Sequence, residues 1–382
     1  MIELENYLDN AATTPVLPEV LTAARPFLEN GFGNPSSLHA LGMEAHRAVK
    51  QAREDVARLI GVPPKAITFT SGGTESDNLA LRGVFASDRL KGERLLISAI
   101  EHPAVRETAQ ALAKEGVRVE VIPVTTGGII DLPRLEALLD KDVRMVSCMA
   151  VNNELGTRQP LVEIGSLLRN LAPKAIFHVD AVQAFTKAPI PWKEAGVHLL
   201  SLSGHKIHAP KGVGALVQCK SVPLAPVMHG GGQEDGLRSG TENPFAIVGF
   251  AQAAKATTQA HAVQREERVA YHQKWLEFLG KFPRLQVFRS EYETPFIINL
   301  RLEPVPAEVI LHHLEQEGLY VSTGSACHTR KPEPSAVLLA AGLNRNAALS
   351  SIRLSFSLHN TQDSLEKVFP AFHRAMEKLE KL

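Results

Sequence analysis

Residues 200–212, LSLSGHKIHAPKG, are the stretch from which the fold of this chain can be worked out. An apolar run typical of a buried strand leads into it and stops at Ser203 and Gly204. His205 and Lys206 follow on the turn beyond, where open α/β sheets place their ligand-binding groups. A lysine at the end of a buried strand costs desolvation energy unless it has a partner or loses its charge. Taken alone, the motif favours a surface lysine that happens to follow a strand.

An acid at the end of another predicted strand changes this balance. Residues 178–183, HVDAVQ, combine an apolar strand with Asp180 at its carboxyl end. Pyridoxal phosphate needs a lysine with which it forms a Schiff base, and commonly a carboxylate that keeps its pyridine nitrogen protonated. The sequence offers both groups, each at its own strand end. We therefore predict that Lys206 is a reactive amine and that Asp180 is the acid that accompanies it.

The length and composition describe an ordinary globular protein. With 382 residues and 44% hydrophobic content, the chain can bury a large core, and its length favours two domains. Lys plus Arg and Asp plus Glu number 41 each, so we expect no broad positive surface for nucleic acid or an anionic membrane.

The first residues and the cysteines indicate the compartment. Residues 1–6, MIELEN, are acidic and lack the basic and apolar regions of a secretory signal. No apolar run reaches membrane-spanning length. Cys148, Cys219 and Cys327 are too far apart for a CxxC metal site or a disulfide framework. We expect a cytoplasmic protein with no membrane and no nucleic-acid partner.

A Gly-rich turn follows the strand predicted at residues 66–70. It reads SGGTES, and the next helix begins near Gly73 and Thr74. Free backbone N–H groups and the positive end of the helix dipole would let an anion bind there. A plain helix N-cap explains the same residues equally well. A Walker A lysine and a GxGxxG run are both missing, which disfavours a nucleotide.

Two further predicted strands, at residues 94–99 and 143–149, also end in polar groups. His102 after the first could transfer protons or lie flat on a flat cofactor, although its position alone favours a capping or core histidine. In all, five strand ends carry polar groups: Thr74; His102; Asn153; Asp180 with Gln183; and Ser203 with His205 and Lys206. Alternating strands and helices imply a mostly parallel sheet whose carboxyl ends share one edge, so we expect these groups to converge.

The motifs taken together resemble a known family. They are LDNAATTP, GNPSS, TFTSGGTESDN, EHPAV, NNELGT, HVDAVQ, SGHKIHAPKG, GGGQEDGLRSGTEN and STGSAC, in this order. This set is similar to the cysteine desulfurases of the nitrogen-fixation and iron–sulfur-cluster type, in the class V aminotransferase group of fold-type I pyridoxal-phosphate enzymes. The resemblance covers essentially the whole chain. It implies an α/β fold with a large domain at 15–255, whose mostly parallel seven-stranded sheet is sandwiched by helices. A smaller α+β domain would comprise 1–14 and 256–382.

The resemblance also implies a role for each matching residue. Those expected around the cofactor are Gly73, Thr74, His102, Asn153, Asp180, Gln183, Ser203, His205, Lys206 and Thr241. Lys206 would hold the cofactor and later move the substrate Cα proton, while Asp180 would pair with the pyridine nitrogen and Gln183 with the phenolic oxygen. His102 would stack on the ring. Thr241 would reach the phosphate from the other subunit of an obligate homodimer.

The second half of the chain offers a thiol and a guanidinium. Cys327 lies in a loop of small and then basic residues, and exposure beside cations lowers a thiol pKa and favours a nucleophile. Arg353 lies in an apolar predicted strand, where an unpaired charge is costly, so it should face an anion such as a substrate carboxylate. Cys148 and Cys219 fit buried strand positions instead.

Substrate contacts are expected from Asn34, Asn153 and Arg353. Asn34 is only a candidate, because the polar loop GFGNPSS that carries it is also typical of a plain linker. The histidines, including His312 and His313, lack the spacing of metal ligands, and we expect no metal.

The activity implied by the resemblance is conversion of L-cysteine to L-alanine, with the sulfur carried by Cys327 as a persulfide. The sulfur would pass to an acceptor protein, an iron–sulfur scaffold or one of the tRNA-thiolation type. Two departures from the usual pattern are Ala209 after the lysine motif and the basic residues 328–331 after the cysteine. The second departure leaves open a selenocysteine lyase, while a non-catalytic cofactor-binding scaffold is the alternative of a different class.

Overall fold

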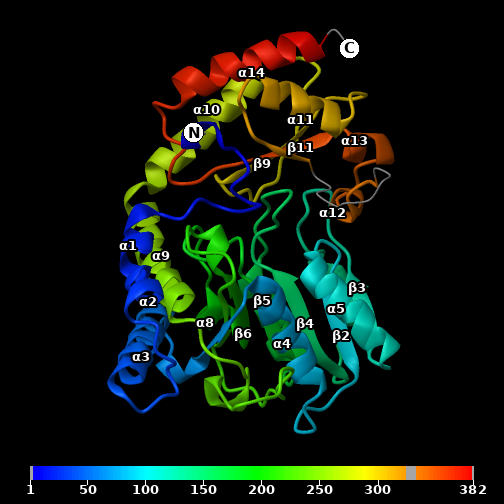
Figure 1. Ribbon diagram of the computed structural model, residues 1–382. Helices are drawn as coiled ribbons and strands as arrows, with labels where there is room; N and C mark the ends of the chain where they lie inside the picture. Colours follow the sequence, from blue (N-terminus) through cyan, green and yellow to red (C-terminus); the bar gives the residue numbers. More distant parts are fainter. Residues whose placement is uncertain (1–2, 324–332, 381–382) are drawn as a thin grey trace.

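A computed structural model describes residues 3–323 and 333–380 (Figure 1). Its larger sheet has seven strands in the order β1-β7-β6-β5-β4-β2-β3. They are β1 (Ile67–Thr70), β2 (Arg94–Ser98), β3 (Arg118–Ile122), β4 (Val143–Met149), β5 (Ile176–Asp180), β6 (Leu199–Ser203) and β7 (Gly214–Gln218). All neighbouring pairs are parallel except those of β7 with β1 and β6. The predicted α/β class with a mostly parallel seven-stranded sheet is therefore confirmed.

Helices cover both faces of this sheet, because its strands are apolar on both sides. One face packs on α4 (Gly73–Phe85) and α5 (Pro103–Lys114), and residues such as Ile97 and Met145 point to it. The other face receives Leu96 and Val146. It packs on α1 (Pro18–Ala24), α3 (Ala40–Ile60), α6 (Leu132–Leu138), α7 (Leu161–Leu171), α8 (Trp192–Ala195) and α9 (Pro244–Val263). The short α2 (Pro26–Glu29) joins α1 to the loop before α3.

The polar and charged stretch at about 254–279 predicts one long helix from the sequence, and these bounds are wrong. The structure has two helices there, α9 and α10 (Arg265–Leu279), which meet at Gln264. The first begins ten residues earlier than predicted, at Pro244, with Asn243 as its side-chain cap. Its first turns are almost wholly apolar, because they lie buried against α3 and α1, so no polar face marks them as helical in the sequence.

A second, antiparallel sheet has the order β10-β11-β9-β8. Its strands are β8 (Gln286–Val287), β9 (Ile297–Arg301), β10 (Ser322–Thr323) and β11 (Ser351–Ser355). The helices in this second part of the chain are α10, α11 (Ala307–Gln316), α12 (Ala336–Ala340), α13 (Arg345–Leu349) and α14 (Leu365–Leu379). Its own apolar cluster centres on Trp275, whose ring stacks on Phe356 at 5.7 Å. The predicted domain bounds stay a prediction, and the one at 255/256 falls within α9.

The N-terminal segment, residues 7–14, runs between the two sheets (Figure 1). Leu8 hydrogen-bonds through its backbone to Tyr320 and Ser355 of the second sheet's side. Thr14 donates its backbone N–H to the carbonyl of His205 at 2.9 Å, at the end of the large sheet. This segment, which we call the N-terminal strap, therefore connects both sheets at the edge where the site was expected.

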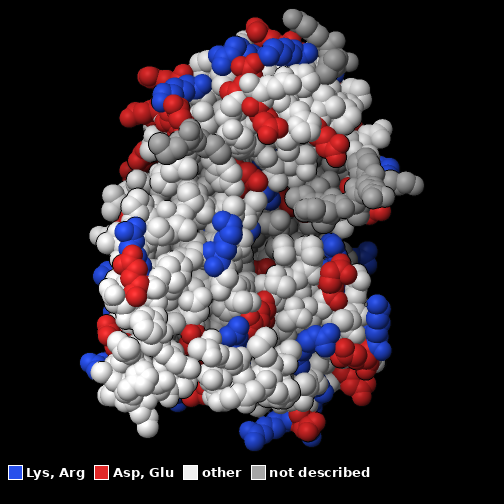
Figure 2. All heavy atoms as spheres, viewed as in Figure 1, with Lys and Arg blue, Asp and Glu red and all other residues white. Residues whose placement is uncertain are grey.

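Positive and negative side chains alternate over the face shown in Figure 2, without a broad patch of one sign. Within residues 3–323 and 333–380, none of the helices has the length and apolar character needed to cross a membrane.

Candidate active site

Lys206 lies where the sequence placed it, just beyond β6. A short 3-10 turn, Gly204–Lys206, follows the strand, and a Cβ on Gly204 would come within 2.8 Å of Val213. The Lys206 Nζ donates hydrogen bonds to the carbonyls of Ala11 and Ala12, each at 2.7 Å. Burial, together with the charge of Arg353, lowers the pKa of Lys206 to about 8. Its amine is thus available as a nucleophile or base close to neutral pH.

Asp180 ends the neighbouring strand β5 and is buried. Its Oδ1 accepts a hydrogen bond from the Val182 backbone at 2.9 Å. Burial raises the pKa of Asp180 to about 6, against the lowering effect of that hydrogen bond and of Lys206. Gln183 donates through Nε2 to the carbonyl of Ala11 at 2.9 Å, the oxygen that also accepts from Lys206. The strap therefore brings Lys206 and Gln183 together, with Asp180 close by.

The start of α4 faces the end of β6. A Cβ on Gly73 would lie 2.7 Å from Val182 Cγ2 and 3.5 Å from Ser203 Cβ, so only glycine leaves this space open. The Ser203 hydroxyl is buried and finds no hydrogen-bond partner among the residues that the structure describes. His205 shares a hydrogen bond with the Thr13 hydroxyl at 3.2 Å, and Thr74 is exposed on the first turn of α4.

These features fit the phosphate of the predicted cofactor. A buried hydroxyl without a partner needs a polar ligand, and the backbone N–H groups at the start of α4 suit an anion. A reactive amine and a carboxylate occupy adjacent strand ends nearby. Pyridoxal phosphate would thus be held by Lys206, Asp180, Ser203 and the start of α4.

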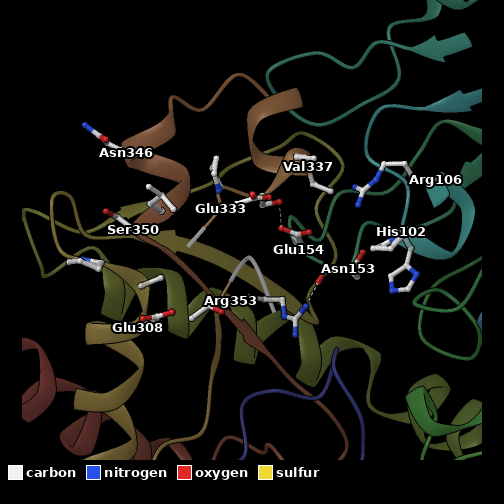
Figure 3. A pocket seen from close by; sticks show the side chains of 18 of the residues that line it. His102, Arg106, Asn153, Glu154, Glu308, Glu333, Val337, Asn346, Ser350 and Arg353 are labelled. Atoms are coloured by element: carbon white, nitrogen blue, oxygen red, sulfur yellow. Dashed lines mark hydrogen bonds between the residues drawn. The ribbon is translucent and has the colours of Figure 1, made fainter. Parts of the chain in front are cut away.

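His102 combines the two interpretations that the sequence left open. It is the N-cap of α5, where its Nδ1 accepts a hydrogen bond from the Ala104 backbone at 3.1 Å. It also lines a cavity of about 600 Å³ between the strand ends and the second sheet (Figure 3). Burial lowers its pKa to about 4, with Lys206 and Arg106 adding to the effect. The ring is therefore neutral at physiological pH.

The same cavity is lined by Arg106, Asn153, Glu154 and Arg353, all visible in Figure 3. Glu154 accepts a hydrogen bond from the hydroxyl of Ser335 at 2.6 Å. Burial raises the pKa of Glu154 to about 7, despite that hydrogen bond and the two arginines. The cavity thus contains two guanidinium groups, a neutral imidazole and a carboxyl that titrates near neutral pH.

Arg353, in β11, does face an anion, and that anion belongs to the strap. Its Nη2 donates to Asp9 Oδ1 at 2.6 Å and its Nη1 to the carbonyl of Asn153 at 2.8 Å. Its buried Nε has no hydrogen-bond partner within the described parts of the chain. The sequence indicated an anionic partner but could not identify Asp9.

Several acids beneath the site were not predicted. Asp77 of α4 and Glu101 are buried, and burial raises the pKa of both, that of Glu101 to about 8. Burial lowers the pKa of His178 to about 3, and its ring shares hydrogen bonds with the hydroxyls of Ser147 at 2.8 Å and Ser201 at 2.9 Å. For these buried groups, the only signal in the sequence was an acidic residue, Asp77, on the otherwise apolar face of α4. Asp9 and the carbonyls of the strap left no such signal, because a short extended motif shows neither burial nor partners.

Of the predicted residues within the described chain, His102, Asn153 and Arg353 line this cavity, whereas the groups around Lys206 are not part of its lining. Asn34 is exposed, and its Oδ1 accepts from the backbone of Ser36 at 3.0 Å. Thr241 is exposed just before α9. Neither is among the described residues that line the cavity. Their neighbours at 35–37 and 231–235 line a second cavity of about 610 Å³. Cys327 lies outside the described residues.

The other two cysteines are poor nucleophiles. Cys148 is fully buried in β4, as predicted, and burial raises the pKa of its thiol. Cys219 was expected within a buried strand, but it is half-buried on the bend directly after β7. Burial raises the pKa of its thiol to about 12. Across 3–323 and 333–380, no cluster of three His, Cys, Asp or Glu residues could hold a metal.

Comparison with known proteins gives consistent matches. The model of the class-V aminotransferase family matches residues 6–368. The cysteine desulfurase IscS of Dictyoglomus turgidum is 40% identical over 378 residues, which cover 98% of this chain and 95% of that protein. A solved structure of a NifS-like protein has a TM-score of 0.91 at 35% identity and covers 98% of this chain and 99% of its own. A structure of SspA in complex with cysteine has a TM-score of 0.79 at 32% identity, covering 92% of this chain and 98% of its own.

Proposed function

Because the chain belongs to the class-V aminotransferase family, we propose that it is a pyridoxal-phosphate-dependent cysteine desulfurase that converts L-cysteine to L-alanine. Members of this family depend on pyridoxal phosphate. The observation that carries the proposal is the strap, which binds Lys206 through two carbonyls and Arg353 through Asp9. A reactive amine and a carboxylate-binding guanidinium therefore serve one site.

When bound, the cofactor supplies an electron sink for the carbanion that forms at the substrate Cα. Lys206 would hold the cofactor, and its amine, with a pKa of about 8, is suited to move the substrate Cα proton. Asp180 would keep the pyridine nitrogen protonated, and Gln183 would hydrogen-bond the phenolic oxygen. Gly73, Thr74, Ser203 and His205 would hold the phosphate.

On the substrate side, Arg353 binds the carboxylate while Asn153 contacts cofactor and substrate. His102 would stack on the cofactor ring and, as a neutral imidazole, can accept or donate a proton at the cavity. The Cys327 thiolate attacks the substrate sulfur, and the Cβ–S bond breaks with its electron pair going to Cβ, which then takes up a proton. Alanine and a Cys327 persulfide result, so the transfer needs no added oxidant.

A homodimer in which Thr241 completes the partner's phosphate site is part of the proposal. Large apolar side chains are exposed around α2 and the start of α3, among them Phe32, Met43 and Leu38, the last 93% exposed. They lie beside the second cavity, whose lining includes residues 231–235 before Thr241. A second copy of the chain that covers this apolar surface would also bring the Thr241 loop across. The same surface is where Asn34 would reach a neighbouring site.

The sulfur would pass from Cys327 to an acceptor protein, an iron–sulfur scaffold or one of the tRNA-thiolation type, in a reducing cytoplasm. The division at 15–255, with 1–14 and 256–382 as the smaller domain, is kept as part of the proposal. The relatives are named cysteine desulfurases, and this does not favour a selenocysteine lyase. A cofactor-binding scaffold is not favoured either.

The purified, cofactor-loaded protein tests this function. With L-cysteine and a thiol reductant, it should release alanine and sulfide in equal amounts, whereas Cys327→Ala should keep the visible cofactor band but release neither at a comparable rate. Turnover of selenocysteine with no turnover of cysteine would overturn the assignment.

A further inference from the structure

The strap does more than connect two sheets. One of its side chains, Asp9, forms an ion pair with Arg353, the arginine that we propose binds the substrate. Asp9 is held in place by its neighbours: the backbone of Leu8 pairs with Tyr320 and Ser355, and the Asn10 side chain donates to the carbonyl of Ser355 at 3.0 Å. The Asp9 carboxylate therefore reaches Arg353 from a fixed backbone. Its contact of 2.6 Å is a charged hydrogen bond rather than a chance surface ion pair.

Burial explains why Arg353 needs this partner when no substrate is present. Its side chain is only 7% exposed, and that of Asp9 is 20% exposed. A buried guanidinium without a counter-charge is strongly destabilising, so Asp9 neutralises it in the free protein. Asn153 offers only a neutral carbonyl, and Glu154 acts on Arg353 through its charge without a hydrogen bond to it in the structure.

A substrate carboxylate must then share or replace Asp9. The Nε of the same guanidinium has no partner among the described residues but is itself buried, so a substrate carboxylate reaches Arg353 by sharing Nη2 with Asp9 or by displacing Asp9 from it. Two carboxylates on one buried guanidinium repel each other, because one positive charge cannot neutralise both. The affinity for the substrate carboxylate is thereby reduced for as long as Asp9 keeps its charge and position.

We propose that Asp9 is a built-in competitor of the substrate carboxylate at Arg353, and that it sets the affinity of the site for amino-acid substrates. Asp9 is a positioning residue, because it acts on the substrate through Arg353. This inference rests on the proposed role of Arg353 in binding the substrate. It predicts that loss of the Asp9 charge lowers the stability of the substrate-free protein but raises its affinity for carboxylates. Loss of a purely structural residue would not have these two opposite effects.

The test uses the cofactor-loaded enzyme and the variant Asp9→Asn, which keeps the shape and the hydrogen-bond acceptor but removes the charge. KM for L-cysteine should fall about tenfold, corresponding to roughly 1.4 kcal/mol, while kcat changes by less than about threefold. The inhibition constant of 3-mercaptopropionate, which keeps thiol and carboxylate, should fall in parallel. That of cysteamine, which lacks the carboxylate, should stay the same. Glu308→Gln removes an exposed charge from the same cavity and serves as the matched control.

Two outcomes overturn the inference: a KM that rises or stays constant in Asp9→Asn, or an equal effect on cysteamine. Asp9→Ser gives the same comparison if Asp9→Asn folds poorly. The variant Arg353→Lys distinguishes a failure of the inference about Asp9 from a failure of the proposed function. If Arg353→Lys leaves KM for cysteine unchanged, Arg353 does not bind the substrate. If it raises KM while Asp9→Asn fails to lower it, only the competitor role of Asp9 is wrong.

Discussion

Glu101→Gln tests the electrostatic account of the site, because it should stabilise the cofactor-free protein at high pH and destabilise it at low pH. Glu101 is buried beside Asp180, and burial raises its pKa to about 8. With Glu101 neutral, the negative charge that we propose to face the pyridine nitrogen rests on Asp180. Glu101 Oε1 accepts from the Ser98 hydroxyl at 2.6 Å and the Met149 backbone at 2.8 Å, both of which a glutamine oxygen can replace.

The magnitude follows from proton linkage. Between pH 4.5 and pH 8 the unfolded state releases the Glu101 proton while the folded state retains it, so stability falls as pH rises. Keeping this proton costs the fold about 3 kcal/mol at pH 7 and about 0.7 kcal/mol at pH 5, at roughly 1.4 kcal/mol per pH unit. Glutamine avoids this cost. Its Nε2 replaces Oε2, which has no partner among the described residues, at a cost of about 1–2 kcal/mol.

The net effect of Glu101→Gln is therefore a gain of about 1–2 kcal/mol at pH 7 and a loss of about 1 kcal/mol at pH 5. Urea unfolding at a series of pH values from 5 to 8 measures this difference in stability. The first unfolding transition of the variant is compared with that of the natural protein. Glu107→Gln, an exposed change on α5, is the control and should shift stability by less than about 0.5 kcal/mol throughout. A variant that is less stable than the natural protein at every pH would refute the neutral state of Glu101.

Three further predictions concern the cofactor. Lys206→Ala should abolish both the visible band of the bound cofactor and turnover, as absorbance and alanine assays would show, and a variant with normal turnover would contradict the assignment. Ser203→Ala, which removes the unpartnered buried hydroxyl, should weaken cofactor binding by about 10-fold, or roughly 1.4 kcal/mol, in equilibrium titration, whereas unchanged binding would exclude a phosphate contact. Lys206→Ala and Thr241→Asp should each be inactive, yet re-assorted equal mixtures should regain about a quarter of the natural activity, since half the dimers are mixed and each has one intact site. Mixtures shown to contain heterodimers but still inactive would mean that Thr241 serves its own subunit.

The sheet and its functional edge could be predicted from the sequence because buried parallel strands leave a strong local signal. An apolar run ending in Ser203 or in Asp180 shows both the strand and its polar end, and the structure places these ends side by side. The antiparallel β7 was not among the strands predicted from the sequence. It follows the site motif as a short apolar run, and nothing local distinguishes its direction.

The strap shows why the rest of the site could not be predicted. Asp9 is a single acidic residue in a short extended motif. Its role depends on a contact with Arg353, which is far away in the sequence. The acceptors for Lys206 are backbone carbonyls, which every residue has, so their role depends only on the path of the chain. Likewise, the partner of Glu154 is Ser335, which the fold alone brings near.

The most direct test of the central claim is a single turnover of L-cysteine on the cofactor-loaded protein without added reductant, followed by alanine analysis and intact-mass and peptide mass spectrometry. The prediction is one alanine per active site and a mass gain of one sulfur atom that maps to Cys327. A persulfide on Cys148 or Cys219, or sulfide release with pyruvate and ammonia in place of alanine, would contradict it.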